Sequence, residues 1–193
     1  MKKILRITAL AALAVLLVIS LASCKKDSST PDGMKLASNE KADFTLYVPE
    51  SWTVDMAEAA VGAYCSKTDP SSVSMMAWEL ENSDSNVDDW WEVNLPEIEK
   101  VFSDVEVTST EDTVIDGLYA KKYVYTAKLG DYEYTIMQAA CVKKATVYVF
   151  TYESLPESFD SHLSEAADML ANIKIGKKRN GKDRTLSRQF GDN

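Results

Sequence analysis

The sequence predicts an α+β domain in which a central antiparallel sheet is flanked by two helices. Three observations lead to this fold class. Residues 105–154 are rich in β-branched and aromatic residues, which favour strands. The segments 91–102 and 159–173 each carry apolar residues at helical spacing. The expected order of elements is β-β-β-α-β-β-β-β-α.

The first part of the domain consists of strand-like runs separated by turns. Residues 44–48 alternate in side-chain character, and a turn at Pro49–Ser51 leads into the start of a second strand. The runs 60–68 and 71–81 are also strand-like, and residues 69–71 form a turn between them.

A helix is expected next. Its apolar residues share one face: Trp91, Leu95, Ile98 and Phe102. Asn86 and Asp89 precede this face and suit a helix N-terminus. Pro96 removes a backbone hydrogen bond, so we expect either a kink or a break near Asn94.

The β-rich segment contains two predicted hairpins. Gly130-Asp131 is a two-residue turn signal, and this turn would place Lys128 opposite Glu133. A second turn is expected at 143–145. Residues 147–152 then carry apolar side chains on both faces, so this strand needs cover on both sides.

The last predicted element is a helix. Residues 154–157 (SLPE) fit a capping box with proline near the first helical position. Its expected buried residues follow helical spacing: Phe159, Leu163, Ala166, Leu170 and Ile173.

The N-terminus has the layout of a secretory signal, in which basic residues precede an uncharged run at 7–21 that is short for a membrane span. This run ends in Leu21-Ala22-Ser23-Cys24, which resembles the bacterial lipobox. The resemblance implies a lipid on the Cys24 thiol, and hence attachment to membrane lipid on the extracytoplasmic side of the cell envelope. An ordinary signal peptide with a coincidental cysteine is the alternative.

Four parts follow from these patterns. We expect a lipoprotein signal peptide at 1–23, a flexible tether at 24–41, a globular domain at 42–175 and a basic, disordered tail at 176–193. The net charge of the chain is −9, and residues 34–173 contain 26 acidic against nine basic residues. Such an acidic domain repels phosphates, which excludes nucleic acid as a partner.

The strand patterns of the domain resemble the PsbP-like superfamily. The resemblance is carried by FTLYVPESW at 44–52, DGLYAKKYVYTAKLGDYEYTIMQ at 116–138 and VYVFTYES at 147–154, followed by the closing helix. It implies a central antiparallel sheet sandwiched between helices, in a superfamily with many bacterial lipoproteins of unassigned function. It also implies a docking module rather than an enzyme, and it carries over no functional residue.

Few residues suggest chemistry. Cys65 and Cys141 form neither a CxxC motif nor a metal-ligand cluster, so they are either a disulfide or two buried thiols. His162 is the one histidine, and Asp160 and Ser161 point away from it on a helix, which excludes a Ser/His/Asp triad. We expect His162 to be a surface or boundary residue, and we expect no catalytic residue, metal or cofactor.

Two further features have structural explanations. The acidic residues from Asp84 lack the glycine and the final glutamate of a calcium loop, and helix capping accounts for them. Trp91 belongs to the apolar face of its helix, which leaves Trp90 as an exposed contact for a protein or carbohydrate, or as a residue packed against a strand.

The predicted function is a membrane-anchored extracytoplasmic lipoprotein whose domain binds a protein or a small envelope ligand without catalysis. The alternatives are an envelope enzyme, either a hydrolase or a thiol redox protein that uses Cys65 or Cys141, and an acidic binding protein that responds to cations.

Overall fold

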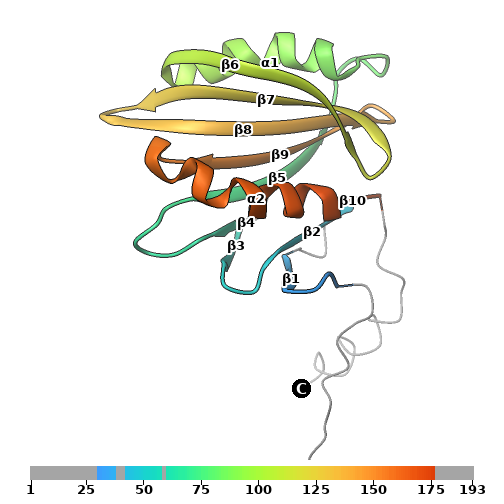
Figure 1. Cartoon of the computed structure of the whole chain (residues 1–193). Helices are drawn as coiled ribbons and strands as arrows, with labels where there is room; N and C mark the ends of the chain where they lie inside the picture. Colours follow the sequence, from blue (N-terminus) through green and yellow to red (C-terminus); the bar gives the residue numbers. More distant parts are fainter. Residues whose placement is uncertain (1–29, 38–41, 58–59, 177–193) are drawn as a thin grey trace, which may run out of the picture. The chain divides into compact units, whose positions relative to one another are not determined.

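The computed structural model describes residues 30–37, 42–57 and 60–176 (Figure 1). The predicted signal peptide, the lipid-attachment residue Cys24 and nearly all of the predicted tail lie outside these residues. Within the described part of the chain, no helix combines the length and the apolar character needed to cross a membrane.

Seven strands form the central antiparallel sheet, in the order β3-β4-β5-β9-β8-β7-β6. These strands are β3 (Thr53–Ala57), β4 (Ala60–Tyr64), β5 (Ser72–Glu79), β6 (Ser103–Ile115), β7 (Leu118–Leu129), β8 (Tyr132–Lys143) and β9 (Thr146–Ser154). With two helices beside this sheet, the predicted α+β class is confirmed.

A smaller antiparallel sheet holds three strands, β1 (Met34–Ala37), β2 (Phe44–Pro49) and β10 (Lys174–Ile175), with β2 in the middle. The strand β1 corrects the predicted boundary, because its residues were assigned to the flexible tether. A four-residue strand has too short a pattern to be recognised alone, and it forms here because β2 offers a pairing edge and Ala37 is fully buried. Five strands precede the first helix instead of the predicted three, and β1 accounts for one of the two additional strands.

The two predicted hairpins are confirmed. Gly130-Asp131 joins β7 to β8, and Lys128 lies opposite Glu133 as expected. Gly130 has a φ of 61°, which glycine adopts at little cost. The second turn, at Lys144-Ala145, joins β8 to β9.

The first helix, α1 (Val87–Val101), begins with the predicted cap. The Asn86 side chain accepts hydrogen bonds from the backbone of the first turn, and Asp89 completes a capping box by accepting from the Asn86 backbone. The helix continues through Pro96, so of the two predicted alternatives the break near Asn94 does not occur. Pro96 lies on the exposed side of α1, where water can satisfy the carbonyl that loses its partner.

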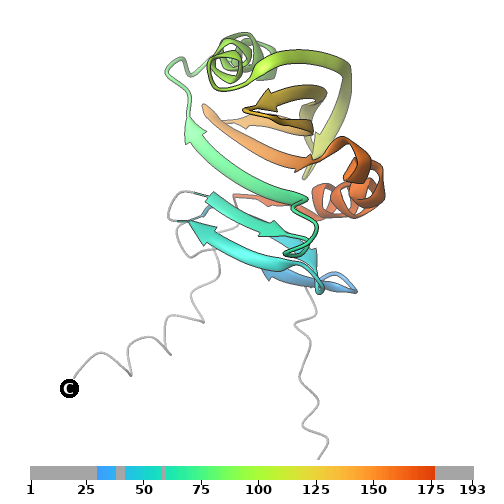
Figure 2. The same cartoon turned by 90° about the vertical axis from the view of Figure 1, so that its left-hand side faces the viewer.

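Strand β9 has the predicted two apolar faces, and each packs beneath a different helix. Val147 and Val149 belong to the cluster under α1, whereas Tyr148 and Phe150 belong to the cluster under the second helix. Figure 2 shows the two helices on different sides of the strands β7 to β9. Burial on both faces makes β9 a central element of the core.

The second helix, α2 (Pro156–Asn172), starts with proline as predicted, but it has no capping box. Leu155 is its N-cap and offers no side-chain hydrogen bond, while the Ser154 hydroxyl is hydrogen-bonded to Ser71 instead. Apolar residues of α2 and its end lie in the core: Phe159, Ala166, Met169, Leu170 and Ile173. Leu163, which the helical spacing placed among them, is exposed.

Candidate functional site

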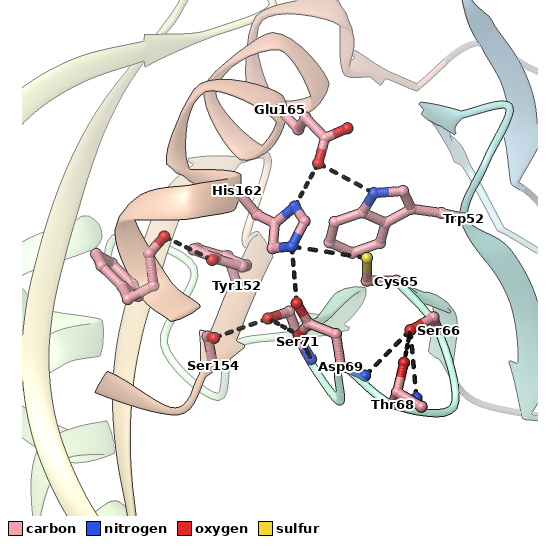
Figure 3. A network of polar contacts seen from close by, with 11 residues as sticks. Trp52, Cys65, Ser66, Thr68, Asp69, Ser71, Tyr152, Ser154, His162 and Glu165 are labelled. Carbon is pink, nitrogen blue, oxygen red and sulfur yellow. Dashed lines mark hydrogen bonds and ion pairs between the residues drawn. The ribbon is translucent and has the colours of Figure 1, made fainter. Parts of the chain in front are cut away.

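A polar cluster lies where the loop between β4 and β5 meets α2 (Figure 3). Cys65 and Asp69 come from the loop, and His162 comes from the second turn of the helix. The Nε2 atom of His162 is 3.0 Å from Oδ2 of Asp69 and 3.6 Å from Sγ of Cys65. The donor atoms of these three side chains all lie within 4.8 Å of one another.

The loop is held in shape by its own hydrogen bonds. The backbone N–H of Cys65 donates to the carbonyl of Ser71 across the base of the loop, at 2.8 Å. Both the backbone N–H and the hydroxyl of Ser71 donate to Oδ1 of Asp69, at 3.0 and 2.6 Å. The buried hydroxyls of Ser71 and Ser154 are 2.7 Å apart, which ties the loop to the end of β9. These hydrogen bonds therefore fix the position of the Asp69 carboxylate.

The other ring nitrogen of His162 is also occupied. Its Nδ1 atom lies 2.6 Å from Oε2 of Glu165, one helical turn further along α2. The same carboxylate oxygen accepts a hydrogen bond of 3.2 Å from Nε1 of Trp52. The buried Trp52 ring also meets the imidazole edge to face, with centroids 5.6 Å apart. These contacts fix the plane of the imidazole.

Electrostatics in the cluster favour an imidazolium beside a neutral thiol. The hydrogen bonds from Ser71 lower the pKa of Asp69, and His162 lowers it further. Burial lowers the pKa of His162, but the hydrogen bonds to Glu165 and Asp69 outweigh burial and raise it above its ordinary value. Burial raises the pKa of Cys65, and the two neighbouring carboxylates add to this rise.

The sequence did not predict this cluster. His162 is a boundary residue, as expected, and Asp160, two residues before it, is exposed. No metal-ligand set was expected because the candidate residues are not closely spaced along the sequence. In the structure, residues 65 and 69 of the loop after β4 meet residue 162 of α2 and form such a set. The one local signal was Glu165, which stands at i+3 from the histidine on a helix.

The two cysteines are separate free thiols in the structure, so the disulfide considered from sequence is not formed. Cys65 lies at the edge of the polar cluster. Cys141 lies in β8 between Ala120 and Tyr148 of the neighbouring strands and is fully buried. Burial raises the pKa of Cys141 to about 12, as expected for a thiol that acts as a small apolar side chain.

Of the two alternatives for Trp90, the structure supports packing against the sheet and not an exposed contact, because this side chain is only 4% exposed. It packs among Tyr123 and the valines of β9, and Trp91 stacks on Tyr123 with ring centroids 3.8 Å apart. Adjacent helical positions diverge by about 100°. The rings of Trp90 and Trp91 nevertheless both reach the sheet, because both are large enough to contact Tyr123 of β7.

Comparison with known proteins supports the fold. No protein-family model and no curated protein matches the sequence. The solution structure of cyanobacterial PsbP (CyanoP) from Synechocystis sp. PCC 6803 is similar, with a TM-score of 0.58 at 15% identity. The match covers 80% of this chain and 98% of CyanoP. The domain therefore has a PsbP-like fold.

Two further solved structures share this architecture. LpqN of Mycobacterium tuberculosis, described as involved in cell envelope biogenesis, matches with a TM-score of 0.50 at 15% identity, over 69% of this chain and 83% of LpqN. A protein from Bacteroides thetaiotaomicron matches with a TM-score of 0.53 at 13% identity, over 83% of this chain and 59% of the other. At these identities the similarity concerns the fold alone.

Proposed function

We propose that the chain is a lipoprotein that is anchored through Cys24 on the extracytoplasmic side of a membrane. In this proposal its PsbP-like domain binds another protein or a small envelope ligand and catalyses no reaction. The anchor rests on the lipobox-like Leu21-Ala22-Ser23-Cys24 after the apolar run. A second acyl chain on such a cysteine makes membrane attachment lasting, whereas a single chain binds only marginally.

The observation that carries the non-catalytic role is the hydrogen bonding of His162. Cys65 beside a histidine would suggest a nucleophile and its base, since such a base must accept the thiol proton. Here both ring nitrogens already face carboxylates, Nε2 facing Asp69 and Nδ1 facing Glu165. Asp69 lies closer to Nε2 than Cys65 does, at 3.0 against 3.6 Å, and burial raises the pKa of Cys65, so the pair is not arranged as an activated nucleophile.

Among the described residues, the redox alternative lacks a second sulfur close to Cys65. Thiol redox enzymes exchange electrons through two cysteines that approach each other. Cys65 and Cys141 are both free, and Cys141 is enclosed in the sheet where no oxidant or protein thiol reaches it. The geometry therefore supports binding over thiol exchange.

The fold neighbours are consistent with an envelope role. LpqN is described as a protein of cell envelope biogenesis, and CyanoP is the cyanobacterial form of PsbP. Both are compatible with a PsbP-like domain that acts by docking, which is the role that the superfamily resemblance implied.

The anchor can be tested by mass spectrometry of the full-length protein purified from membranes. The proposal predicts an N-terminal peptide that begins at Cys24 and carries the mass of a diacylglyceryl group. The Cys24→Ser variant should lose this mass, while the matched variant Cys141→Ser should retain it. A mature chain that begins elsewhere, or an unmodified Cys24 thiol, would refute the anchor.

Docking can be tested by crosslinking the anchored protein in its native envelope. A matched control joins residues 1–33 to an unrelated domain, so that it shares the anchor and the segment before β1 but no strand of the PsbP-like fold. The proposal predicts at least one crosslinked species that is specific to the complete chain. Identical crosslinking patterns for both proteins would contradict a binding role for the domain.

A further inference from the structure

We propose that Cys65, Asp69 and His162 form a zinc site with three protein ligands. The Cys65 thiolate, one carboxylate oxygen of Asp69 and Nε2 of His162 would bind the ion. This inference goes beyond the proposed anchoring and docking, and it does not depend on either.

The separation of Cys65 and His162 fits the ion, and that of His162 and Asp69 is close to the required value. Zinc–sulfur bonds of about 2.3 Å and zinc–nitrogen bonds of about 2.05 Å place these two atoms about 3.6 Å apart in a tetrahedron. The observed separation of Cys65 Sγ and His162 Nε2 is 3.6 Å. The corresponding nitrogen–oxygen separation is about 3.4 Å. Nε2 and the nearer Asp69 oxygen are now 3.0 Å apart, so that carboxylate would need to retreat by about 0.4 Å.

The surrounding contacts are those of a prepared metal site. Histidines that bind zinc usually donate their other N–H to a carboxylate, which fixes the tautomer and the ring orientation. Glu165 accepts at Nδ1 of His162 in this way, and Trp52 holds Glu165 in turn. The second oxygen of Asp69 is held by Ser71. Two of the three proposed ligands therefore already have the supporting partners that such sites use.

The donor set selects the kind of metal. A thiolate and an imidazole favour zinc and related transition ions, whereas magnesium and calcium prefer sites made of oxygen donors alone. The site is also accessible, since the side chains of His162 and Asp69 are 17% and 27% exposed. Three protein ligands leave one position for solvent or for a donor atom of a bound ligand.

Zinc binding would displace protons from its ligands. The thiol proton of Cys65 leaves as sulfur becomes a ligand, and Nε2 of His162 binds the metal in its deprotonated form. The displaced protons pass to solvent, while the hydrogen bond between Nδ1 and Glu165 is retained.

The test uses the full-length protein in detergent with a phosphine reductant, stripped of metal by a chelator and titrated with zinc by calorimetry. We expect one equivalent to bind. The variants Cys65→Ser and His162→Gln should each weaken binding about 100-fold or more, and Glu165→Gln should weaken it about 10- to 100-fold. Cys141→Ala is the matched thiol control and should bind zinc as the unaltered protein does.

Cobalt provides a second readout that does not depend on the folding of a variant. In the unaltered protein we expect a thiolate-to-cobalt charge-transfer band together with the visible bands of a four-coordinate ion, and added zinc should remove both. Circular dichroism without metal should show that Cys65→Ser remains folded. Absence of saturable zinc binding, or equal binding by Cys65→Ser and the unaltered protein, would overturn the proposal.

Discussion

The buried hydroxyl of Ser71 holds Asp69 of the candidate site by a hydrogen bond, and removal of this hydroxyl should destabilise the whole domain. Ser71 is fully buried and donates a hydrogen bond of 2.6 Å to Oδ1 of Asp69. Since the Ser71 hydroxyl has one hydrogen and donates it to Asp69, it must accept from Ser154, whose oxygen lies 2.7 Å away. The Ser71→Ala variant breaks both bonds at once.

The expected cost follows from these two bonds. A hydrogen bond to a charged group contributes about 1.5–3 kcal/mol, and a buried hydroxyl left without a partner costs about 1–3 kcal/mol. Asp69 is partly exposed and keeps the bond from the Ser71 backbone, so the lower half of each range applies. We therefore expect the free energy of unfolding to fall by about 2–4 kcal/mol.

Urea unfolding of Ser71→Ala, Ser154→Ala and the double variant measures this effect, provided that the slopes of the three transitions agree. The double variant leaves neither hydroxyl unpaired, so it should cost less than the sum of the single variants by about 1–2 kcal/mol. Ser161→Ala changes an exposed serine of α2 and serves as the control, with an expected change within about 0.5 kcal/mol. Additive single effects, or a Ser71→Ala cost equal to that of the control, would refute the reasoning.

Three further predictions concern the core, the turn and the site. Phe150→Ala empties a fully buried position in β9 and should cost about 3–5 kcal/mol in urea unfolding, whereas the exposed Val93→Ala should change little; similar midpoints would contradict the assigned core. Gly130→Ala places a side chain at a positive φ with no atom in its way and should cost about 1 kcal/mol, so an unchanged midpoint would argue against this turn. Burial lowers the pKa of His162, but its two carboxylate partners raise this pKa overall. The stabilisation of the folded domain by the His162 ion pairs is therefore complete at a pH below the pKa of His162 in the unfolded chain. It is lost as the pH rises through the pKa of His162 in the folded domain. With chelator present, His162→Gln should flatten this decline between mildly acidic and alkaline pH, and an unchanged pH profile would exclude the assigned ion pairs.

Local chemistry explains the parts of the fold that the sequence predicted. The Gly130-Asp131 turn sets the register of β7 against β8 because only two residues separate the strands. The Asn86 cap and the leading Pro156 mark the helix starts through contacts within one turn. The two apolar faces of β9 predicted that other elements pack on both sides of this strand, and the two helices do so.

Features that depend on distant partners were predicted less well. The strand β1 has four residues and forms because β2 pairs with it, so its own pattern carried little information. The burial of Trp90 depends on how α1 lies across β7, which a helical periodicity does not specify. Ser154 was expected to cap α2, but its hydroxyl is hydrogen-bonded to Ser71, which is distant in the sequence.

By itself, the sequence determined the α+β class, the hairpin register, both helices and the resemblance to a lipobox at Cys24, because periodicity and turn chemistry act over a few neighbouring residues. The polar cluster was decided only by the tertiary structure. Antiparallel pairing of β5 with β9 sets Ser72 opposite Glu153 and so brings the loop that carries Cys65 and Asp69 against the start of α2. Strand order in a sheet is a long-range property, and this is why three residues that look unrelated along the chain share one site.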